Sequence, residues 1–240
     1  MKRLLILCGG KSAEHEISIK TTKNILNAID RTKFTPILAG VSRSGTWYYI
    51  EDEALLETLE RIDDIYDIDS IASLVKIPAY SCLVTQQGVT IPIDVALATL
   101  HGPNGEDGTL QGLFELSAIP YVGAGVLACA AAMDKDVFKE LLSFNNIPTT
   151  PSITLTQQDK RPSYSQLTEA LGGDVFFIKP SCMGSSVGVS KVKNEVALEA
   201  AIETAFAYSH KVLVEKGIDC REIECAVLGN LEPKASILGE

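Results

Sequence analysis

The chain has 240 residues, of which 46% are hydrophobic and 22% are charged. This composition is typical of a folded globular protein with one large or two small domains, and it excludes a disordered chain. The 31 acidic and 21 basic residues give a formal net charge of −10. That balance argues against a nucleic-acid partner, because no basic face could be broad enough to offset the field, but it leaves room for a small anionic ligand held by local lysines.

The amino terminus and the cysteines indicate the cellular compartment of the protein. Residues 1–8 combine a Lys-Arg pair with an apolar run, but the run ends at Gly9-Gly10 and is too short for a signal peptide. No apolar stretch reaches transmembrane length, and the six cysteines contain no C-x-x-C pair, so neither disulfides nor a zinc site is expected. We therefore predict a cytoplasmic protein without a membrane partner.

Apolar runs alternate with helical patterns along the first half of the chain. Residues 3–8 form a continuous apolar run into Gly9-Gly10, as a buried parallel strand does where it enters a loop. This alternation predicts an open parallel α/β sheet whose ligands bind outside the carboxyl ends of its strands, so the loops at 9–16 and 101–109 should face one crevice. The other expected elements are helices over 17–29, 55–65 and 109–117, strands over 34–41, 46–50 and 94–100, and irregular or short β structure over 72–89.

The second half of the chain has a different rhythm. Residues 124–144 are predicted to form one helix, with M-D-K at 133–135 in its middle, that ends at N-N-I-P. A smaller α+β unit is expected to follow. Its predicted elements are strands over 152–156, 175–178 and 211–214, helices over 163–171 and 195–208, and two β-like runs over 222–228 and 235–238.

A glycine-bearing turn joins two strands of this second unit. Residues 179–190, K-P-S-C-M-G-S-S-V-G-V-S, follow one apolar run and lead into another, as in a hairpin that covers a ligand. Backbone N–H groups among its glycines and serines can surround phosphate oxygens, and Lys179 can add a full positive charge. The alternative is an ordinary flexible hairpin, and on this stretch alone the two interpretations carry similar weight.

Four separated motifs decide between these interpretations. They are G-G-K-S-A-E-H-E-I-S at 9–18, H-G-P-N-G-E-D-G-T-L-Q-G at 101–112, M-D-K at 133–135 and K-P-x-x-x-G-S-S-x-G at 179–188. In this order, and along the whole chain, they resemble the D-alanine–D-alanine ligases of peptidoglycan synthesis, which are members of the ATP-grasp superfamily.

The resemblance implies a domain plan and a reaction. It implies an amino-terminal α/β domain over residues 1–122, a central ATP-grasp lobe over 123–215 and the start of a carboxy-terminal lobe over 216–240, which is incomplete. It also implies that the carboxylate of one D-alanine takes the γ-phosphoryl group of ATP to become an acyl phosphate. The amine of a second D-alanine then attacks, and phosphate leaves.

The resemblance assigns three residues to the first substrate. Glu14 matches the acid that holds the ammonium of the first D-alanine, and Ser185 matches the hairpin serine that hydrogen-bonds to that acid. His101 matches a loop residue near the carboxylate of this substrate, and Glu106 matches a residue that helps fix the loop. The alternatives are a helix-start glutamate, a plain turn serine and a structural histidine.

The resemblance also implies an ATP site that includes a hinge for adenine and an acid for ribose. Its two phosphate-binding lysines would be Lys135 and Lys179, although single lysines are more often solvated surface charges. The hinge would read adenine largely through backbone groups. The implied ATP-binding residues are Lys135, Lys179, Gly184, Ser186, Glu215, Lys216 and Ile218, with Glu222 at the ribose.

Mg²⁺ and a homodimer are the remaining implications of the resemblance. The family's metal ligands follow the position of Glu240, so we predict no metal ligand among these residues and expect a longer natural protein. Cys182 and Met183 depart from the pattern, because many relatives have charged residues there. His15 and His210 are predicted to be ordinary surface residues.

Two alternative functions stay open. One is another ATP-grasp carboxylate–amine ligase, such as a D-alanine–D-lactate ligase. The other is a non-catalytic module that only binds ATP. Glu14 and Ser185 favour a ligase, because an ATP sensor has no need of a site for the ammonium of D-alanine.

Overall fold

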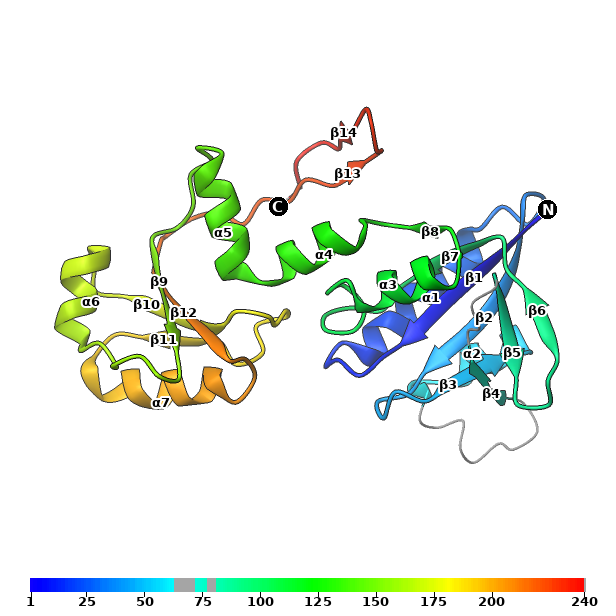
Figure 1. Cartoon of the computed structure of the whole chain (residues 1–240), viewed down its shortest axis with the longest axis horizontal. Helices are drawn as coiled ribbons and strands as arrows, with labels where there is room; N and C mark the ends of the chain where they lie inside the picture. Colours follow the sequence, from blue (N-terminus) through cyan, green and yellow to red (C-terminus); the bar gives the residue numbers. More distant parts are fainter. Residues whose placement is uncertain (63–71, 77–80, 240) are drawn as a thin grey trace.

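Strand β1 (Lys2–Gly9) is the apolar run at the amino terminus, and it lies inside an eight-stranded sheet (Figure 1). Its last six residues are buried, as expected for a strand that is covered on both faces. The computed structural model describes residues 1–62, 72–76 and 81–239.

One half of this sheet is parallel and the other half is antiparallel. The parallel strands are β2 (Phe34–Val41), β1, β7 (Val95–Ala98) and β8 (Tyr121–Val122). The antiparallel strands beyond β2 are β3 (Trp47–Ile50), β4 (Ala72–Lys76), β5 (Cys82–Thr85) and β6 (Thr90–Pro92). The predicted open parallel α/β sheet is therefore confirmed on one side of β3. The expectation of irregular or short β structure over 72–89 is confirmed by the short strands β4 and β5, and residues 77–80 lie outside the described part.

Helices cover both faces of the sheet because successive side chains of β1 point to opposite sides. Helices α1 (His15–Ala28) and α2 (Glu53–Thr58) share a hydrophobic cluster with Leu4, Ile6 and Cys8. Helix α3 (Thr109–Leu116) packs in a second cluster with Leu5 and Leu7. Helix α2 is shorter than the predicted helix over 55–65, because the backbone is already extended at Leu59, and residues 63–65 lie outside the described part.

The predicted single helix over 124–144 is wrong at its centre. Helix α4 (Val126–Met133) ends and α5 (Lys135–Phe144) begins at Asp134, whose φ of −82° and ψ of 100° are extended. The Asp134 carboxylate accepts hydrogen bonds from the backbone N–H groups of Asp136 and Val137. Aspartate favours this N-cap conformation over the helix interior, so it divides the segment into two helices. The M-D-K motif therefore lies at the junction of the two helices, which we call the α4–α5 hinge to distinguish it from the segment expected to bind adenine.

A four-stranded antiparallel sheet forms the second lobe, in the order β11-β10-β12-β9. Its strands are β9 (Ser152–Thr156), β10 (Phe176–Pro180), β11 (Ser190–Val192) and β12 (Lys211–Lys216). Helices α6 (Tyr164–Leu171) and α7 (Glu195–Phe206) pack on this sheet, and β13 (Val227–Leu228) pairs with β14 (Lys234–Ala235) further along. Nowhere in the described residues is a helix both long and apolar enough to cross a membrane.

The two faces of this second sheet carry different kinds of side chain. Phe176 and Ile178 of β10, with Val212 and Val214 of β12, join the hydrophobic cluster that α6 and α7 cover. The residues between them therefore point to the opposite face. Lys179 is one of these residues, so the apolar core of the lobe determines on which side of the sheet this charge lies.

We predict that Gly9 cannot be replaced without loss of stability. Its φ is +86°, and a Cβ atom at this position would lie 2.3 Å from the carbonyl oxygen of Val41. Gly9→Ala should therefore lower the free energy of unfolding by more than about 1 kcal/mol in urea titrations. Gly112→Ala is the matched control, because Gly112 lies in α3 with nothing within 4 Å, and it should keep or raise stability. Equal stability of the two variants would contradict this account.

Candidate active site

A cavity of about 460 Å³ lies on the face of the second sheet that carries Lys179. Its lining includes every residue predicted to bind ATP, together with Ser185. These are Lys135, Lys179, Gly184, Ser186, Glu215, Lys216, Ile218 and Glu222, contributed by α5, β10, the turn between β10 and β11, β12 and the segment that follows β12. The fold thus brings residues that are up to 87 positions apart in the chain, from Lys135 to Glu222, to one cavity.

The turn between β10 and β11 has an unusual backbone. Ser185 and Ser186 have φ values of +49° and +58°, and the N–H of Val187 donates to the carbonyl oxygen of Gly184 at 3.1 Å. Two positive φ values with this hydrogen bond define a type I′ turn, which usually contains asparagine or glycine. Serine in the left-handed region is strained, and such strain gathers at functional sites.

Three backbone N–H groups of this turn have no hydrogen-bond acceptor among the described residues. They belong to Gly184, Ser185 and Ser186, all of which line the cavity. Unpaired N–H groups that face a cavity carry a partial positive charge and suit the oxygens of an anion. The geometry of this turn therefore favours a hairpin that binds phosphate over an ordinary flexible hairpin.

Two lysines of the cavity region share one buried carboxylate. The Glu215 carboxylate contacts Lys179 Nζ at 2.5 Å and Lys139 Nζ at 3.0 Å, and Lys139 also donates to the carbonyl oxygen of Thr150. Glu215 is only 8% exposed, so its charge requires these partners. Glu215 was predicted to act largely through its backbone, and Lys139 had no predicted role. Its pairing with Glu215 joins residues 76 positions apart, and no local pattern signals it.

Lys135 is held against the root of the hairpin. Its ammonium group donates to the carbonyl oxygens of Met183, at 2.5 Å, and Ser181, at 3.4 Å. Burial lowers the pKa of Lys135 below its ordinary value, and the nearby positive charge of Lys179 lowers it further. An anion in the cavity would oppose both effects, because it favours the charged ammonium.

Apolar residues form another part of the cavity wall. These residues are Phe177, Met183 and Val189, none of which had a predicted role in binding. Phe177 could have been found, because it is two positions before Lys179 and therefore lies on the same face of β10. An apolar wall beside lysines and free N–H groups suits a ligand that has both a flat ring and an anionic tail.

A second cavity, of about 250 Å³, lies in the amino-terminal lobe. Gly10 and Lys11 from one loop line it together with His101 and Asn104 from another, so the expectation that these loops face one crevice is confirmed. His101 Nε2 is buried here and has no hydrogen-bond partner among the described residues. A polar atom in this state is available to a ligand.

The loop that carries His101 is held by its own acidic residues. Glu106 accepts a hydrogen bond from the N–H of Gly102 at 2.7 Å. Asp107 accepts from the N–H groups of Asn104 and Thr109. These contacts agree with the expectation that Glu106 helps to fix this loop.

Glu14 lies at the start of α1, next to a buried histidine. The prediction that His15 is a surface residue is wrong, because its exposed fraction is 0%. Its Nδ1 contacts the carbonyl oxygen of Gly10 at 2.6 Å, so Nδ1–H donates, and Nε2 accepts from the N–H of Ile62 at 2.9 Å. His15 thus fixes the loop that precedes Glu14.

The predicted partners Glu14 and Ser185 are in different lobes. No hydrogen bond joins their side chains in the part of the chain that the structure describes, and Glu14 is outside the lining of both cavities. Figure 1 shows the turn between β10 and β11 at the side of its lobe that faces the amino-terminal lobe.

Potential metal ligands do not cluster in the described part of the chain. Across residues 1–62, 72–76 and 81–239, no group of three His, Cys, Asp or Glu side chains is arranged to hold a metal ion.

Known proteins resemble the chain in sequence and in structure. Residues 3–124 match the family model described as D-ala D-ala ligase N-terminus, and residues 141–240 match the one described as D-ala D-ala ligase C-terminus. D-alanine--D-alanine ligase A of Salmonella typhimurium is 44% identical over 243 residues, which cover 99% of this chain and 66% of that protein. The chain therefore spans about two thirds of the length of the curated relatives it matches.

Two solved structures share the fold. The D-alanine-D-alanine ligase from Coxiella burnetii has a TM-score of 0.92 and 36% identity, over 99% of this chain and 70% of that one. The D-alanine--D-alanine ligase from Bacillus anthracis complexed with ATP has a TM-score of 0.65 and 28% identity, over 94% of this chain and 62% of that one. Because the family models match both of its halves, the chain belongs to the D-alanine–D-alanine ligase family.

Proposed function

We propose that this protein is an ATP-dependent ligase that joins two D-alanines through an acyl phosphate. The observation that carries the proposal is the cavity where the unpaired N–H groups of the hairpin turn meet Lys135 and Lys179. Membership of the family supports it, and so does the ATP complex of the relative from Bacillus anthracis.

ATP would lie along this cavity with its phosphates at the hairpin. The N–H groups of Gly184, Ser185 and Ser186 would donate to phosphate oxygens, next to the ammonium groups of the two lysines. The adenine ring would lie against Phe177 near the backbone of residues 215–218. Glu222 would accept hydrogen bonds from the ribose hydroxyls at the outer end of the cavity.

The first chemical step would join two anions. A carboxylate oxygen of D-alanine attacks the γ-phosphorus of ATP, the bond from that phosphorus to the bridging oxygen breaks, and ADP leaves with the electron pair. Catalysis of such a transfer consists mainly of positioning and charge neutralisation. Lysines and backbone N–H groups meet this requirement without a nucleophilic side chain.

The second step would form the amide bond. The uncharged amine of a second D-alanine attacks the acyl carbon, the bond from carbon to the phosphate oxygen breaks, and phosphate leaves while the amine loses a proton. Glu14 would hold the ammonium of the first D-alanine by a charge-assisted hydrogen bond, and His101 Nε2 would approach its carboxylate. Ser185 would reach Glu14 when the hairpin closes over both substrates.

Membership of the family also suggests where the protein acts and how it assembles. We propose a cytoplasmic homodimer that supplies peptidoglycan synthesis, with residues 1–122, 123–215 and 216–240 as its successive domains in this chain. Mg²⁺ would take its protein ligands from residues other than those described. The formal net charge of −10 supports the expectation that nucleic acid is not a partner.

The test of this function is ATP-dependent phosphate release by the full-length protein, with mass detection of the dipeptide. We expect D-alanine to stimulate release and D-alanyl-D-alanine to accumulate. Glu14→Gln should raise the KM for the first D-alanine by about tenfold or more and leave ATP binding unchanged, because only an ammonium contact is lost. If the protein binds ATP but forms no dipeptide, the proposal is wrong and the protein is a nucleotide-binding module. If it prefers D-lactate to D-alanine as the second substrate, it is a D-alanine–D-lactate ligase.

We also predict a pH dependence of ATP binding that arises from Lys135. Burial and Lys179 lower the pKa of this ammonium from its ordinary 10.5 in the free protein, whereas bound phosphate favours its charged form. The affinity for ATP should therefore fall as the pH rises through the lowered pKa, at a lower pH than for an ordinary lysine. Calorimetric titrations from about pH 7 to about pH 10 would measure this fall.

Lys135→Arg should abolish this alkaline loss of affinity, because arginine stays protonated throughout the range. The exposed Lys160, replaced by arginine, is the matched control and should keep the loss. An affinity that does not change with pH in the unaltered protein would contradict the role given to Lys135.

A further inference from the structure

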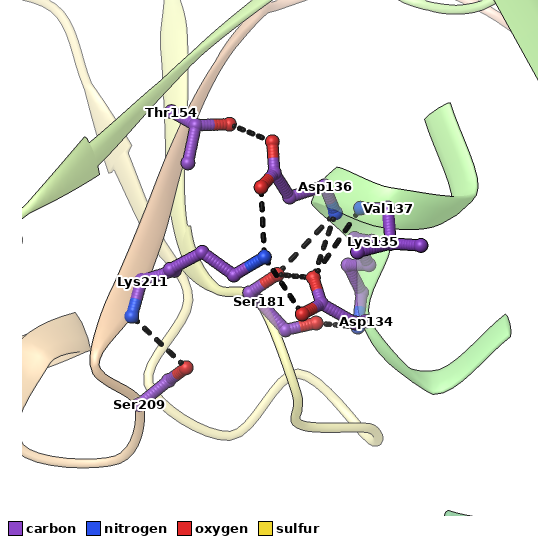
Figure 2. A network of polar contacts seen from close by, with 8 residues as sticks. All are labelled: Asp134, Lys135, Asp136, Val137, Thr154, Ser181, Ser209 and Lys211. Carbon is purple, nitrogen blue, oxygen red and sulfur yellow. Dashed lines mark hydrogen bonds and ion pairs between the residues drawn. The ribbon is translucent and has the colours of Figure 1, made fainter. Parts of the chain in front are cut away.

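A cluster of charged groups lies directly behind Lys135, outside the proposed ATP site. The carboxylates of Asp134 and Asp136 each contact the ammonium of Lys211 at 2.7 Å, as Figure 2 shows. Lys211 is the first residue of β12, and the two aspartates flank Lys135 at the α4–α5 hinge. None of these three charged residues lines the ATP cavity.

Ser181 connects this cluster to the hairpin. Its hydroxyl donates to Asp134 Oδ1 at 2.5 Å and accepts from the N–H of Asp136 at 3.3 Å. Its carbonyl oxygen accepts from the N–H of Lys135 at 3.1 Å, and its own N–H donates to the carbonyl oxygen of Lys211 at 3.0 Å. Ser181 is 0% exposed and comes directly after β10, so it forms the root of the glycine turn.

The cluster also reaches the edge of the sheet. Thr154 of β9 donates its hydroxyl hydrogen to Asp136 Oδ1 at 2.6 Å, and Asp136 Oδ2 contacts Lys211 (Figure 2). Strands β9 and β12, the residue that follows β10, and the hinge therefore meet at two carboxylates. The side chains of Asp134, Asp136 and Lys211 are 19%, 22% and 17% exposed, which reduces the screening of their charges by water.

The groups of the cluster favour each other's charged forms. Burial acts to raise the pKa of Asp134, but hydrogen bonds from Lys211 and Ser181 outweigh it and the net pKa is lowered. Burial acts to lower the pKa of Lys211, but the two aspartates outweigh it and the net pKa is raised. Without Lys211, the carboxylates of Asp134 and Asp136 would share this site without a cation. Two like charges in a partly buried site repel each other.

The contacts of the cluster converge on the two parts of the chain that enter the ATP site. The backbone of Lys135 is bound to Ser181, and its ammonium is bound to the carbonyl oxygen of Met183 in the same turn. The core of the lobe is on the other face of the sheet and includes none of the cluster's residues. A purely structural cluster would not have to end at a phosphate-binding lysine and at the root of the turn.

We propose that Lys211, through Asp134, Asp136 and Ser181, is a positioning residue that sets Lys135 and the glycine turn in register for the phosphates of ATP. Lys211 itself does not contact the nucleotide. This inference rests on the proposed function, because it assigns the cavity to ATP.

The test compares Lys211→Met, Lys211→Arg and the unaltered full-length protein in ATP affinity, steady-state kinetics and thermal unfolding. We expect Lys211→Met to weaken ATP binding and raise the KM for ATP by roughly 10- to 100-fold, because small misplacements of a binding group have effects of this size. The KM for D-alanine should stay unchanged, and Lys211→Arg should restore most of the ATP affinity, because arginine keeps the charge.

Two further variants keep the test decisive. Arg161→Met removes an ion pair with Glu203 in the same lobe, away from the cavity, so it should lower stability without changing ATP affinity. Ser181→Ala removes only the hydroxyl link and should weaken ATP binding in the same direction as Lys211→Met, even where the latter fails to fold. Unchanged ATP affinity in a folded Lys211→Met or Ser181→Ala protein would overturn the proposal.

Hydrogen exchange of the ligand-free protein separates this inference from the proposed function. The amides of Lys135, Val187 and Val189 donate within the hinge and the turn, so they should exchange faster in Ser181→Ala and keep their rates in Arg161→Met. If the unaltered protein fails to bind ATP, the proposed function is wrong, and these amides still report whether the cluster orders the hinge and turn. Unchanged exchange at all three amides in Ser181→Ala would overturn the positioning role.

Discussion

The antiparallel pairing of β10 with β12 determines where the charged groups of the cavity lie. Phe177 pairs with Glu215, and Lys179 pairs with Leu213, in one continuous register. The alternate residues of both strands are buried under α6 and α7. A slip by one residue would turn Lys179 into the apolar core, so hydrophobic burial on one face keeps the charged groups on the other.

The local electrostatics of the cavity are opposite to those of the whole chain. The chain has a formal net charge of −10, yet Lys135, Lys179 and Lys216 line the cavity, and Glu215 is shared by Lys179 and Lys139. The carboxylate keeps Lys179 oriented while the cavity is empty of anions. A phosphate group would compete for the same ammonium, so the ion pair with Glu215 would have to weaken as ATP binds.

Much of this arrangement could be predicted from local sequence patterns. The buried run of β1, the paired strands around the glycine turn and the convergence of two loops near His101 all follow from hydrophobic periodicity and parallel-sheet geometry. The hinge at Asp134 was missed, although an aspartate after an alanine-rich helix is an N-cap signal. The residues on both sides of Asp134 favour helix, so a single aspartate between them is a weak signal for a break.

Other features could not be predicted because they depend on contacts between distant residues. His15 has the polarity of a surface residue, and its burial follows from its bonds to the backbone of Gly10 and Ile62. Lys139 and Lys211 resemble ordinary solvated lysines in the sequence, and each finds its carboxylate more than 70 positions away. Only the tertiary fold identifies such pairs.

The most direct test of this account follows the backbone amides of the glycine turn by NMR while the protein is titrated with ATP. We predict that the amides of Gly184, Ser185 and Ser186 shift together, with the dissociation constant that calorimetry gives for ATP. The amide of Gly88, which is already bonded in a turn of the other lobe, should not move. Saturable ATP binding that leaves all three turn amides unshifted would contradict the claim that this turn binds the phosphates.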